Sequence, residues 1–445
     1  MNEAIERHNV SDADVRKAVG AAAMGNALEW FDFGIYGYLA VTIGQVFFPS
    51  QSTTGSLLWV FAVFALAFLV RPLGGIFFGP LGDKIGRNRV LAATIIMMSA
   101  ATFAIGLLPG YATAGLWAPA GLIVARLIQG FSTGGEYGGA ATFMVEYASD
   151  KRRGFLSSWL EFGTLAGYIL SGVLVATLTA VLSSEAMTSW GWRIPFLMAG
   201  PLGIIGLYLR LKLEDSPIFR ELEKAGQVSK APLRDTLRYH WRQMLLCIGL
   251  VIMLNVAYYT VLKYMPSYLT TQLNIGDLAS LLLSLGTLAG MMILVTFIGR
   301  LSDNVGRKPI LLGACLGFIF LAWPAFYLMI HGGGFVVTFA GMAILGLLVV
   351  LLSGVMPATL PAIFPTHIRY SGFAISYNVS TSLFGGTAPL IITWIISQTG
   401  NNYVPAFYLM GAAAISLVAV LFIKETAGKP LSSPRIGDKA HPQTG

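Results

Sequence analysis

Twelve long apolar segments succeed one another along this chain of 445 residues and restrict the folds that it can adopt. They cover approximately residues 20–46, 57–79, 91–108, 117–143, 155–182, 191–211, 243–266, 278–299, 310–330, 335–360, 372–398 and 403–423. A helix that crosses a bilayer needs about 20 mostly apolar residues, so each segment is a candidate span. Only 11% of the residues are charged, whereas a soluble domain carries about 25%. The sequence therefore predicts an all-α integral membrane protein with twelve transmembrane helices.

The basic residues are distributed unevenly between the two sets of connections. If the N-terminus is cytoplasmic, both tails and the connections 2–3, 4–5, 6–7, 8–9 and 10–11 hold nearly all of them. The exceptions among the 29 Lys and Arg residues are Arg71, Arg126, Arg193 and Lys263. Membrane proteins keep Lys and Arg on the cytoplasmic side, so we expect both termini there. The same bias explains the net charge of +8 without a nucleic-acid partner.

A loop motif occurs twice, about half the chain apart. The first copy runs from Gly79 to Arg87, between the second and third spans, and the second runs from Gly299 to Arg307, between the eighth and ninth. We therefore predict two six-helix halves, at 1–211 and 243–424, with a cytoplasmic linker at 212–242 and a flexible cytoplasmic tail at 425–445. Paired halves of this kind enclose a site near the bilayer midplane and expose it to each side in turn.

The repeated loop is a candidate for the cytoplasmic gate. Its glycines allow a tight connection, and its Asp can cap the N-terminus of a neighbouring helix. Contacts between Arg and Asp would hold the cytoplasmic side closed in an outward-facing state. The alternative is a basic loop that only sets the topology. The gate residues that we predict are Gly79, Asp83, Gly86, Arg87, Asp303, Gly306 and Arg307.

Ionisable side chains inside the spans are candidates for function, because each is costly in a bilayer unless it is paired or hydrated. Glu29 and Asp32 lie three residues apart and share one face of the first span. An acid that gains and loses a proton is what coupling to a proton gradient requires. The alternative is an acid permanently paired with Arg126. We predict proton coupling by Glu29, Asp32 and Arg126, with the proton as the coupling ion and no cofactor or metal.

Arg126 also suits a substrate carboxylate, which a guanidinium group binds through two hydrogen bonds. Lys263 lies near the outer end of the seventh span, where it fits either an interfacial belt or a ligand site. Arg71 is interpreted as a side chain that extends to the interface. The substrate-binding residues that we predict are Arg126, Tyr36, Glu161, Asn255, Tyr259, Lys263 and Tyr377.

Several of these motifs resemble those of a known family. Gly-x-x-x-Asp-x-x-Gly-Arg in both halves is similar to the conserved loop of the major facilitator superfamily, and the run from Arg126 to Glu136 resembles its second signature. The runs Gly25–Phe33 and Gly134–Gly138 resemble the metabolite–proton symporter family within it. Its members carry α-ketoglutarate, citrate, shikimate, proline or betaine. Runs such as Thr359–Tyr370 are most similar to the members that carry proline and glycine betaine.

This resemblance implies the major facilitator fold and a secondary active transporter in a bacterial inner membrane, working as a monomer. The implied reaction is proton-coupled import of a small carboxylate-bearing solute similar to proline or betaine. Lys263 adds a cation where the proline and betaine carriers have an uncharged residue, which favours the alternative of an organic acid such as citrate, α-ketoglutarate or another dicarboxylate. An enzyme is not expected, because the histidines are scattered and the sequence has no nucleophile or phosphate-binding motif.

Overall fold

The computed structural model describes residues 12–50, 52–85, 87–211, 237–365 and 369–431, which form helices and no strands. The long helical segments of the first half are α1 (Asp12–Tyr38), α3 (Thr53–Ile85), α4 (Arg87–Leu107), α6 with α7 (Trp117–Thr133 and Glu136–Tyr147), α8 (Arg153–Val181) and α10 (Arg193–Leu211). Those of the second half are α13 with α14 (Trp241–Tyr258 and Met265–Thr271), α15 (Asp277–Val305), α16 (Arg307–His331), α17 with α18 (Phe335–Ser353 and Met356–Thr359), α19 with α20 (Arg369–Ser380 and Ala388–Thr399) and α21 (Val404–Phe422). The described residues thus contain twelve long helical segments, and the all-α twelve-helix prediction is confirmed.

Short helices lie in the connections and at the interruptions. They are α2 (Ala40–Phe47), α5 (Tyr111–Ala114), α9 (Ser184–Ala186) and η3 (Pro361–Ile363), with the π-helical turns η1 (Met187–Gly191), η2 (Tyr259–Tyr264) and η4 (Thr381–Gly385). Within the described residues, eight helices are long and apolar enough to cross a membrane by length and composition, and Ala92–Leu107 and Arg193–Tyr208 are shorter apolar helices. Turns interrupt the first predicted span at Leu39, the fourth at Gly134 and Gly135, the tenth at Gly354 and Val355, and the eleventh at Gly386 and Thr387.

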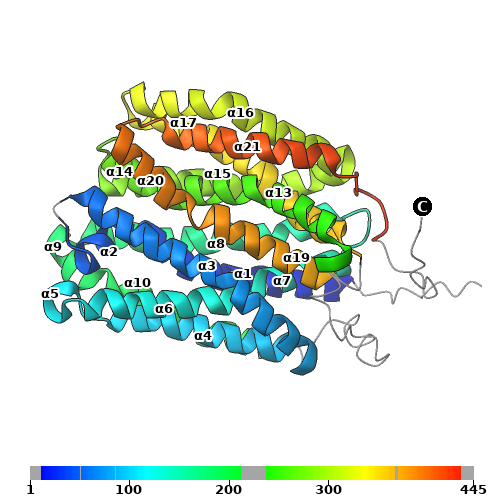
Figure 1. Ribbon diagram of the computed structural model, residues 1–445, viewed down its shortest axis with the longest axis horizontal. Helices are drawn as coiled ribbons and strands as arrows, with labels where there is room; N and C mark the ends of the chain where they lie inside the picture. Colours follow the sequence, from blue (N-terminus) through cyan, green and yellow to red (C-terminus); the bar gives the residue numbers. More distant parts are fainter. Residues whose placement is uncertain (1–11, 51, 86, 212–236, 366–368, 432–445) are drawn as a thin grey trace, which may run out of the picture.

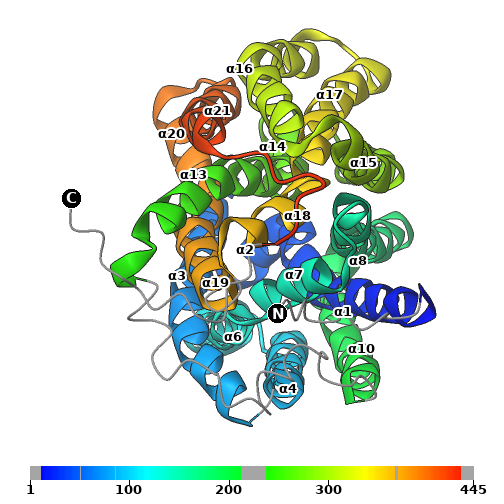
Figure 2. The same cartoon turned by 90° about the vertical axis from the view of Figure 1, so that its right-hand side faces the viewer.

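The helices run roughly side by side, with the start of α1 and the end of α21 at one end of the bundle (Figure 1). We call this end the terminal face, and we call the end that carries α2, α5 and α9 the opposite face. Seen from the terminal face, α1 to α10 group together and α13 to α21 group together (Figure 2). The two groups meet where α8 contacts α15 and where α3 contacts α19 and α20. The predicted linker and tail lie largely outside the described residues, so the domain boundaries stay a prediction.

Helices α1 and α8 approach so closely that glycine is required between them. A Cβ added at Gly163 would lie 2.1 Å from the carbonyl oxygen of Ala23, and one added at Gly167 would lie 2.2 Å from that of Ala27. Small residues allow this backbone contact in membrane bundles, where packing replaces the hydrophobic effect between helices. The two helices that carry Asp32 and Glu161 therefore form one rigid pair.

Substitution of Gly163 by alanine is expected to destabilise the fold, because the new methyl group cannot fit against Ala23. Overpacking of this kind costs about 1–3 kcal/mol. Gly313 is the matched control, since a Cβ there would meet nothing within 4 Å. Thermal unfolding of the purified variants in detergent checks the prediction. We expect a lower Tm for Gly163→Ala and an unchanged or slightly higher Tm for Gly313→Ala; equal Tm values would contradict it.

Candidate functional site

A chain of hydrogen bonds connects the acid of α1 to the arginine of α6. Arg126 donates from Nη1 to Oε1 of Gln129 over 2.8 Å, and Gln129 donates from Nε2 to Oγ1 of Thr102 over 2.6 Å. Thr102 Oγ1 lies 3.1 Å from Oδ2 of Asp32. All four side chains are buried. Asp32 and Arg126 are thus linked through two neutral side chains, and a direct ion pair between them is not among the contacts of the described residues.

Two buried guanidinium groups keep donors that no described residue accepts. Arg71 and Arg126 are each 1% exposed. The atoms without a hydrogen-bond partner are Nε, Nη1 and Nη2 of Arg71 and Nε and Nη2 of Arg126. Their guanidinium carbons lie 5.1 Å from the ring centre of Phe68 and 4.1 Å from that of Tyr36, respectively. The interpretation of Arg71 as a side chain at the interface is wrong, since its charge is buried. Buried donors of this kind require an acceptor from water or a ligand.

The ammonium group of Lys263 is enclosed by aromatic rings, and we call this group of rings the aromatic cage. The distances from Nζ to the ring centres are 4.7 Å for Phe33, 5.1 Å for Phe64, 5.3 Å for Tyr168, 5.7 Å for Tyr259 and 5.9 Å for Trp30. Its one recorded hydrogen bond goes to the backbone carbonyl of Phe33 over 2.8 Å. Lys263 is 2% exposed and stands on the π-helical turn η2. It is therefore part of the interior and not of an interfacial belt.

Glu161 connects the two groups of helices. Its Oε1 accepts a hydrogen bond from the hydroxyl of Tyr137, and its Oε2 accepts one from the hydroxyl of Tyr258, each over 2.7 Å. Glu161 and Tyr137 stand on α8 and α7, whereas Tyr258 stands at the end of α13. Tyr377 of α19 stacks on Tyr137 with the ring centres 4.4 Å apart. Two tyrosines of the second group thus contact the first group: Tyr258 donates to Glu161, and Tyr377 stacks on Tyr137.

The other predicted site residues fall into two sets. Tyr36 and Tyr259 lie beside the buried cations, and Glu29 is buried on α1 near Asp32. Asn255, in contrast, donates to Thr381 over 2.9 Å and so joins α13 to η4. Among the described residues, no group of three or more His, Cys, Asp or Glu side chains is placed to hold a metal ion.

At the terminal face, the second copy of the repeated loop joins the two groups. Asp303, near the end of α15, accepts hydrogen bonds from the backbone N–H groups of Gly154 and Phe155 over 2.7 and 2.9 Å. It therefore caps the N-terminus of α8 from the other group, which is the arrangement that a helix dipole favours. Arg307 donates instead to the carbonyl of Ala358 over 3.0 Å. Asp303 thus contacts the other group through the backbone at the start of α8.

Further polar contacts close the same face. Arg369 of α19 forms an ion pair with Glu146 of α7 at 3.2 Å. Tyr370 donates to the carbonyl of Gly135 over 3.0 Å, and Asn378 donates to that of Gly134 over 2.5 Å. For the first copy of the loop, Gly86 and the side chains of Asp83 and Arg87, together with Gly79, lie outside what the structure describes. Their role in the gate stays a prediction.

Glu425 follows the last helix and holds the start of α16. Its Oε2 accepts the backbone N–H of Lys308 over 3.0 Å, and its Oε1 accepts those of Thr426 and Ala427 over 2.8 Å each. Partial burial raises the pKa of Glu425, but these backbone donors outweigh it and hold the pKa below its usual range. The carboxylate is therefore ionised at neutral pH and fixes the described start of the tail against the terminal face.

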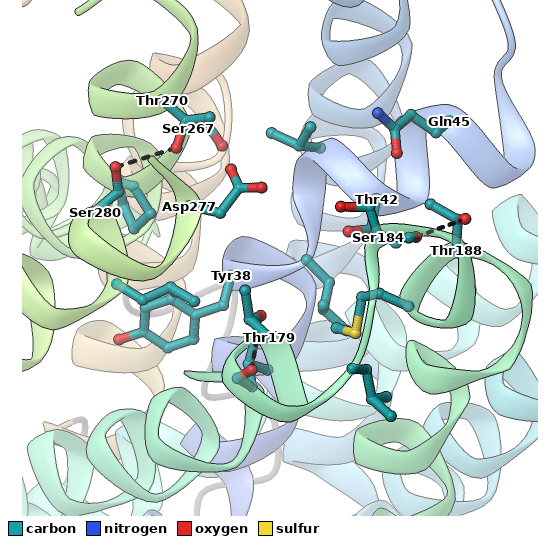
Figure 3. A pocket seen from close by; sticks show the side chains of 17 residues that line it. Tyr38, Thr42, Gln45, Thr179, Ser184, Thr188, Ser267, Thr270, Asp277 and Ser280 are labelled. Atoms are coloured by element: carbon teal, nitrogen blue, oxygen red, sulfur yellow. Dashed lines mark hydrogen bonds between the residues drawn. The ribbon is translucent and has the colours of Figure 1, made fainter. Parts of the chain in front are cut away.

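A cavity of about 140 Å³ lies at the opposite face, between the two groups of helices (Figure 3). Its labelled polar lining residues are Tyr38, Thr42, Gln45, Thr179, Ser184, Thr188, Ser267, Thr270, Asp277 and Ser280. Asp277 carries the only charge among the residues that line it. The cavity comes close to the cage, because Tyr38 follows Gly37, where an added Cβ would lie 3.6 Å from Cβ of Lys263. Among the described residues, the two groups of helices thus contact each other at the terminal face and leave a cavity between them at the opposite face.

Sequence reasoning missed several residues of this site. Thr102 and Gln129 connect Asp32 to Arg126. They are uncharged polar residues inside apolar spans, and this feature of the sequence could have identified them. Arg71 is absent from the predicted site because a long side chain near the end of a span can reach the interface. Of the rings around Lys263, Tyr259 was among the predicted site residues, whereas Trp30, Phe33, Phe64 and Tyr168 were not, since aromatic residues are common throughout this chain.

Comparison with known proteins places the chain in a known group. The model of the Major Facilitator Superfamily matches residues 22–378. The chain is 46% identical to the glycine betaine/proline/ectoine/pipecolic acid transporter OusA of Dickeya dadantii, over 95% of this chain and 86% of that protein. It is 44% identical to the proline/betaine transporter of Escherichia coli K12, with the same coverage.

Solved structures have the same fold at much lower identity. The proton:xylose symporter XylE bound to 6-bromo-6-deoxy-D-glucose superposes with a TM-score of 0.73 and 18% identity, over 94% of this chain and 97% of that one. A partially occluded inward-open form of the E. coli xylose transporter also gives a TM-score of 0.73, at 17% identity, over 94% and 99% of the two chains. At this identity the likeness concerns the fold alone.

Replacement of Asp303 by alanine is expected to loosen the terminal face, because two backbone donors at the start of α8 lose their acceptor across the seam. Spin labels on exposed Lys151 and Asn304 report the separation of the two groups there. The native cysteines are buried and remain unlabelled. Pulsed electron paramagnetic resonance should give longer distances in Asp303→Ala than in the labelled parent. Asp277→Ala, at the other end of α15, is the control, and an unchanged distribution in Asp303→Ala would refute the role of the cap.

Proposed function

The chain belongs to the major facilitator superfamily, and we propose that it imports a small zwitterionic osmolyte such as proline or glycine betaine together with protons. As a member of this superfamily it is a transporter and not an enzyme, and the resemblance inferred from its motifs is confirmed. Transporters with paired halves move a solute by exposing one central site to each side of the membrane in turn. The named solutes of the relatives support the substrate class.

The unpartnered guanidinium donors carry this proposal. Proline and glycine betaine each have one carboxylate, which accepts up to four hydrogen bonds. Arg71 and Arg126 present buried donors without acceptors beside a common group of rings, as a carboxylate site in a low-dielectric interior requires. A substrate carboxylate would satisfy these donors and compensate their charge.

Proton coupling is assigned to the acids of α1. Asp32 is 4% exposed and is connected to Arg126 through Thr102 and Gln129. A change in the protonation of Asp32 changes the hydrogen bond between Asp32 and the hydroxyl of Thr102. The hydroxyl of Thr102 also accepts from Gln129, so the amide of Gln129 reorients, and with it the hydrogen bond that Gln129 accepts from Arg126. Glu29, one turn earlier on the same helix, belongs to the same coupling group. The proton and the carboxylate are thereby linked without direct contact.

The orientation follows from the basic residues. The terminal face carries the connections rich in Lys and Arg, which the positive-inside rule assigns to the cytoplasm of a bacterial inner membrane. With both termini cytoplasmic, the Asp303 cap closes the cytoplasmic side, and the cavity of Figure 3 faces the periplasm. The site and its gates are built from one chain, so we expect a monomer to transport.

An organic acid is the second candidate substrate. Lys263 is a third buried cation close to Arg71 and Arg126, and its ring contacts share Phe33 with the first and Phe64 with the second. A dicarboxylate or tricarboxylate would neutralise more of this charge than a zwitterion does. Side-by-side uptake of proline, glycine betaine, citrate and α-ketoglutarate separates the two candidates.

Replacement of Arg126 by alanine is expected to lower kcat/KM for the transported solute by about 10- to 100-fold, which corresponds to the 1.5–3 kcal/mol of a hydrogen bond to a charged group. Uptake of radiolabelled solute into proteoliposomes with an inward proton gradient measures it. Arg242→Ala is the control, because Arg242 is exposed on α13. Parental kcat/KM in Arg126→Ala would sink the carboxylate assignment.

Replacement of Asp32 by asparagine is expected to separate transport from the proton gradient, since an amide neither gains nor loses a proton in this range. Accumulation driven by an inward proton gradient should be lost, whereas exchange of labelled for unlabelled solute should persist. Both are measured in the same proteoliposomes. Glu185→Gln, at an exposed acid of the opposite face, should behave like the parent. If Asp32→Asn still accumulates solute and the accumulation collapses with a protonophore, Asp32 is not the coupling acid.

A further inference from the structure

The aromatic cage around Lys263 has the composition of a cation-binding site. Its rings come from α1, α3, α8 and η2, so four separate elements converge on one ammonium group. The ring faces carry partial negative charge, and proteins use such cages to bind quaternary ammonium ligands. Most buried charges are compensated by an opposite charge. Among the described residues, the contacts of Lys263 are instead five rings and one backbone carbonyl.

The cage also shares its walls with the guanidinium donors. Phe64 lies 5.1 Å from Nζ of Lys263 and 5.4 Å from the guanidinium carbon of Arg126. Phe33 lies 4.7 Å from Nζ and 5.8 Å from the guanidinium carbon of Arg71. A cation subsite and an anion subsite that share these rings fit a small molecule whose two charges are separated by a few bonds.

We propose that the aromatic cage is the ammonium subsite of this transporter, and that the side chain of Lys263 occupies it until the cation of the substrate displaces it. The identity of that substrate rests on the function proposed above. The ammonium group of Lys263 then takes the place of the substrate cation. It contacts the partly negative ring faces when the transporter is empty, and it competes with every quaternary or secondary ammonium that enters.

The setting of Lys263 allows such an exchange. Its ammonium is held by one hydrogen bond, and its flexible four-carbon stem can withdraw without a change in the backbone. Its backbone lies on a π-helical turn, a local irregularity that is frequent at functional sites. The cavity at the opposite face comes within one residue of Gly37, against which the Lys263 stem packs. A solute that enters through that cavity therefore arrives close to the cage.

Tetramethylammonium tests the cage without reference to transport, because it carries the cation and no carboxylate. The purified full-length parent, Lys263→Ala and Lys263→Met are heated in detergent with increasing tetramethylammonium chloride, with sodium chloride as the control for ionic strength. Alanine empties the cage, whereas methionine refills it with a neutral side chain of similar length. We expect a saturable rise in Tm for Lys263→Ala, with half-saturation at least tenfold lower than for the parent or Lys263→Met. Addition of Phe33→Leu to Lys263→Ala should abolish it.

Glycine betaine tests the displacement in the same assay. Its apparent Kd should be at least fivefold lower for Lys263→Ala than for the parent, because the competing ammonium is gone. The absence of any tetramethylammonium effect on Lys263→Ala, or an equal effect on all three proteins, would overturn the cage. A response to tetramethylammonium with no gain in betaine affinity would overturn the displacement. Failure of the proposed function has a different signature: the parent then transports neither proline nor betaine, while tetramethylammonium still stabilises Lys263→Ala.

Discussion

The burial of three cations against one aromatic cluster is the constraint on which this structure depends. A charged side chain at the centre of a membrane helix costs about 2.5–3.5 kcal/mol on the insertion scale, so three of them require compensation. Arg71, Arg126 and Lys263 obtain much of it from ring faces, each worth up to about 2 kcal/mol when desolvated. Phe33 and Phe64 each contact the ring of Phe68, and all three rings lie beside the cations. The cluster can therefore hold positive charge in the interior and leave the arginine donors available to a ligand.

The same cluster explains why the helices around it are irregular. The π-helical turns η2 and η4 face each other, and a Cβ added at Gly385 would lie 2.6 Å from the ring of Tyr259. Gly134 and Gly135 interrupt the fourth span where it passes α3, and a Cβ at Gly134 would lie 2.2 Å from the carbonyl oxygen of Arg71. These departures from regular helix bring backbone and aromatic rings into contact around the cations.

The sequence predicted the number of helices, the repeated loop and most of the charged residues, because hydropathy and charge act locally and are visible in one chain. It predicted less well how those residues contact each other. Asp303 was expected to cap a helix and to interact with arginine. It accepts the N–H groups at the N-terminus of α8, which a distant segment supplies, and its pairing with arginine stays a prediction. The cage was not predicted for the same reason: Tyr168 and Trp30 are unremarkable in their own spans, and only the packing of α1 against α8 places them around a lysine of the other half.

That packing also determines how the site and the gate are coupled. Because α1 and α8 contact each other backbone to backbone at Gly163 and Gly167, they move as one body. The N-terminus of α8 is capped by Asp303, and further along the helix Glu161 accepts the hydroxyl of Tyr258. Both partners belong to the second half, so one separation of the halves breaks both contacts. A solute that changes the contacts of the cage thereby changes, through a single rigid helix pair, the stability of the closed terminal face. Under the proposed function, binding at the centre and opening at the gate would be two consequences of one movement.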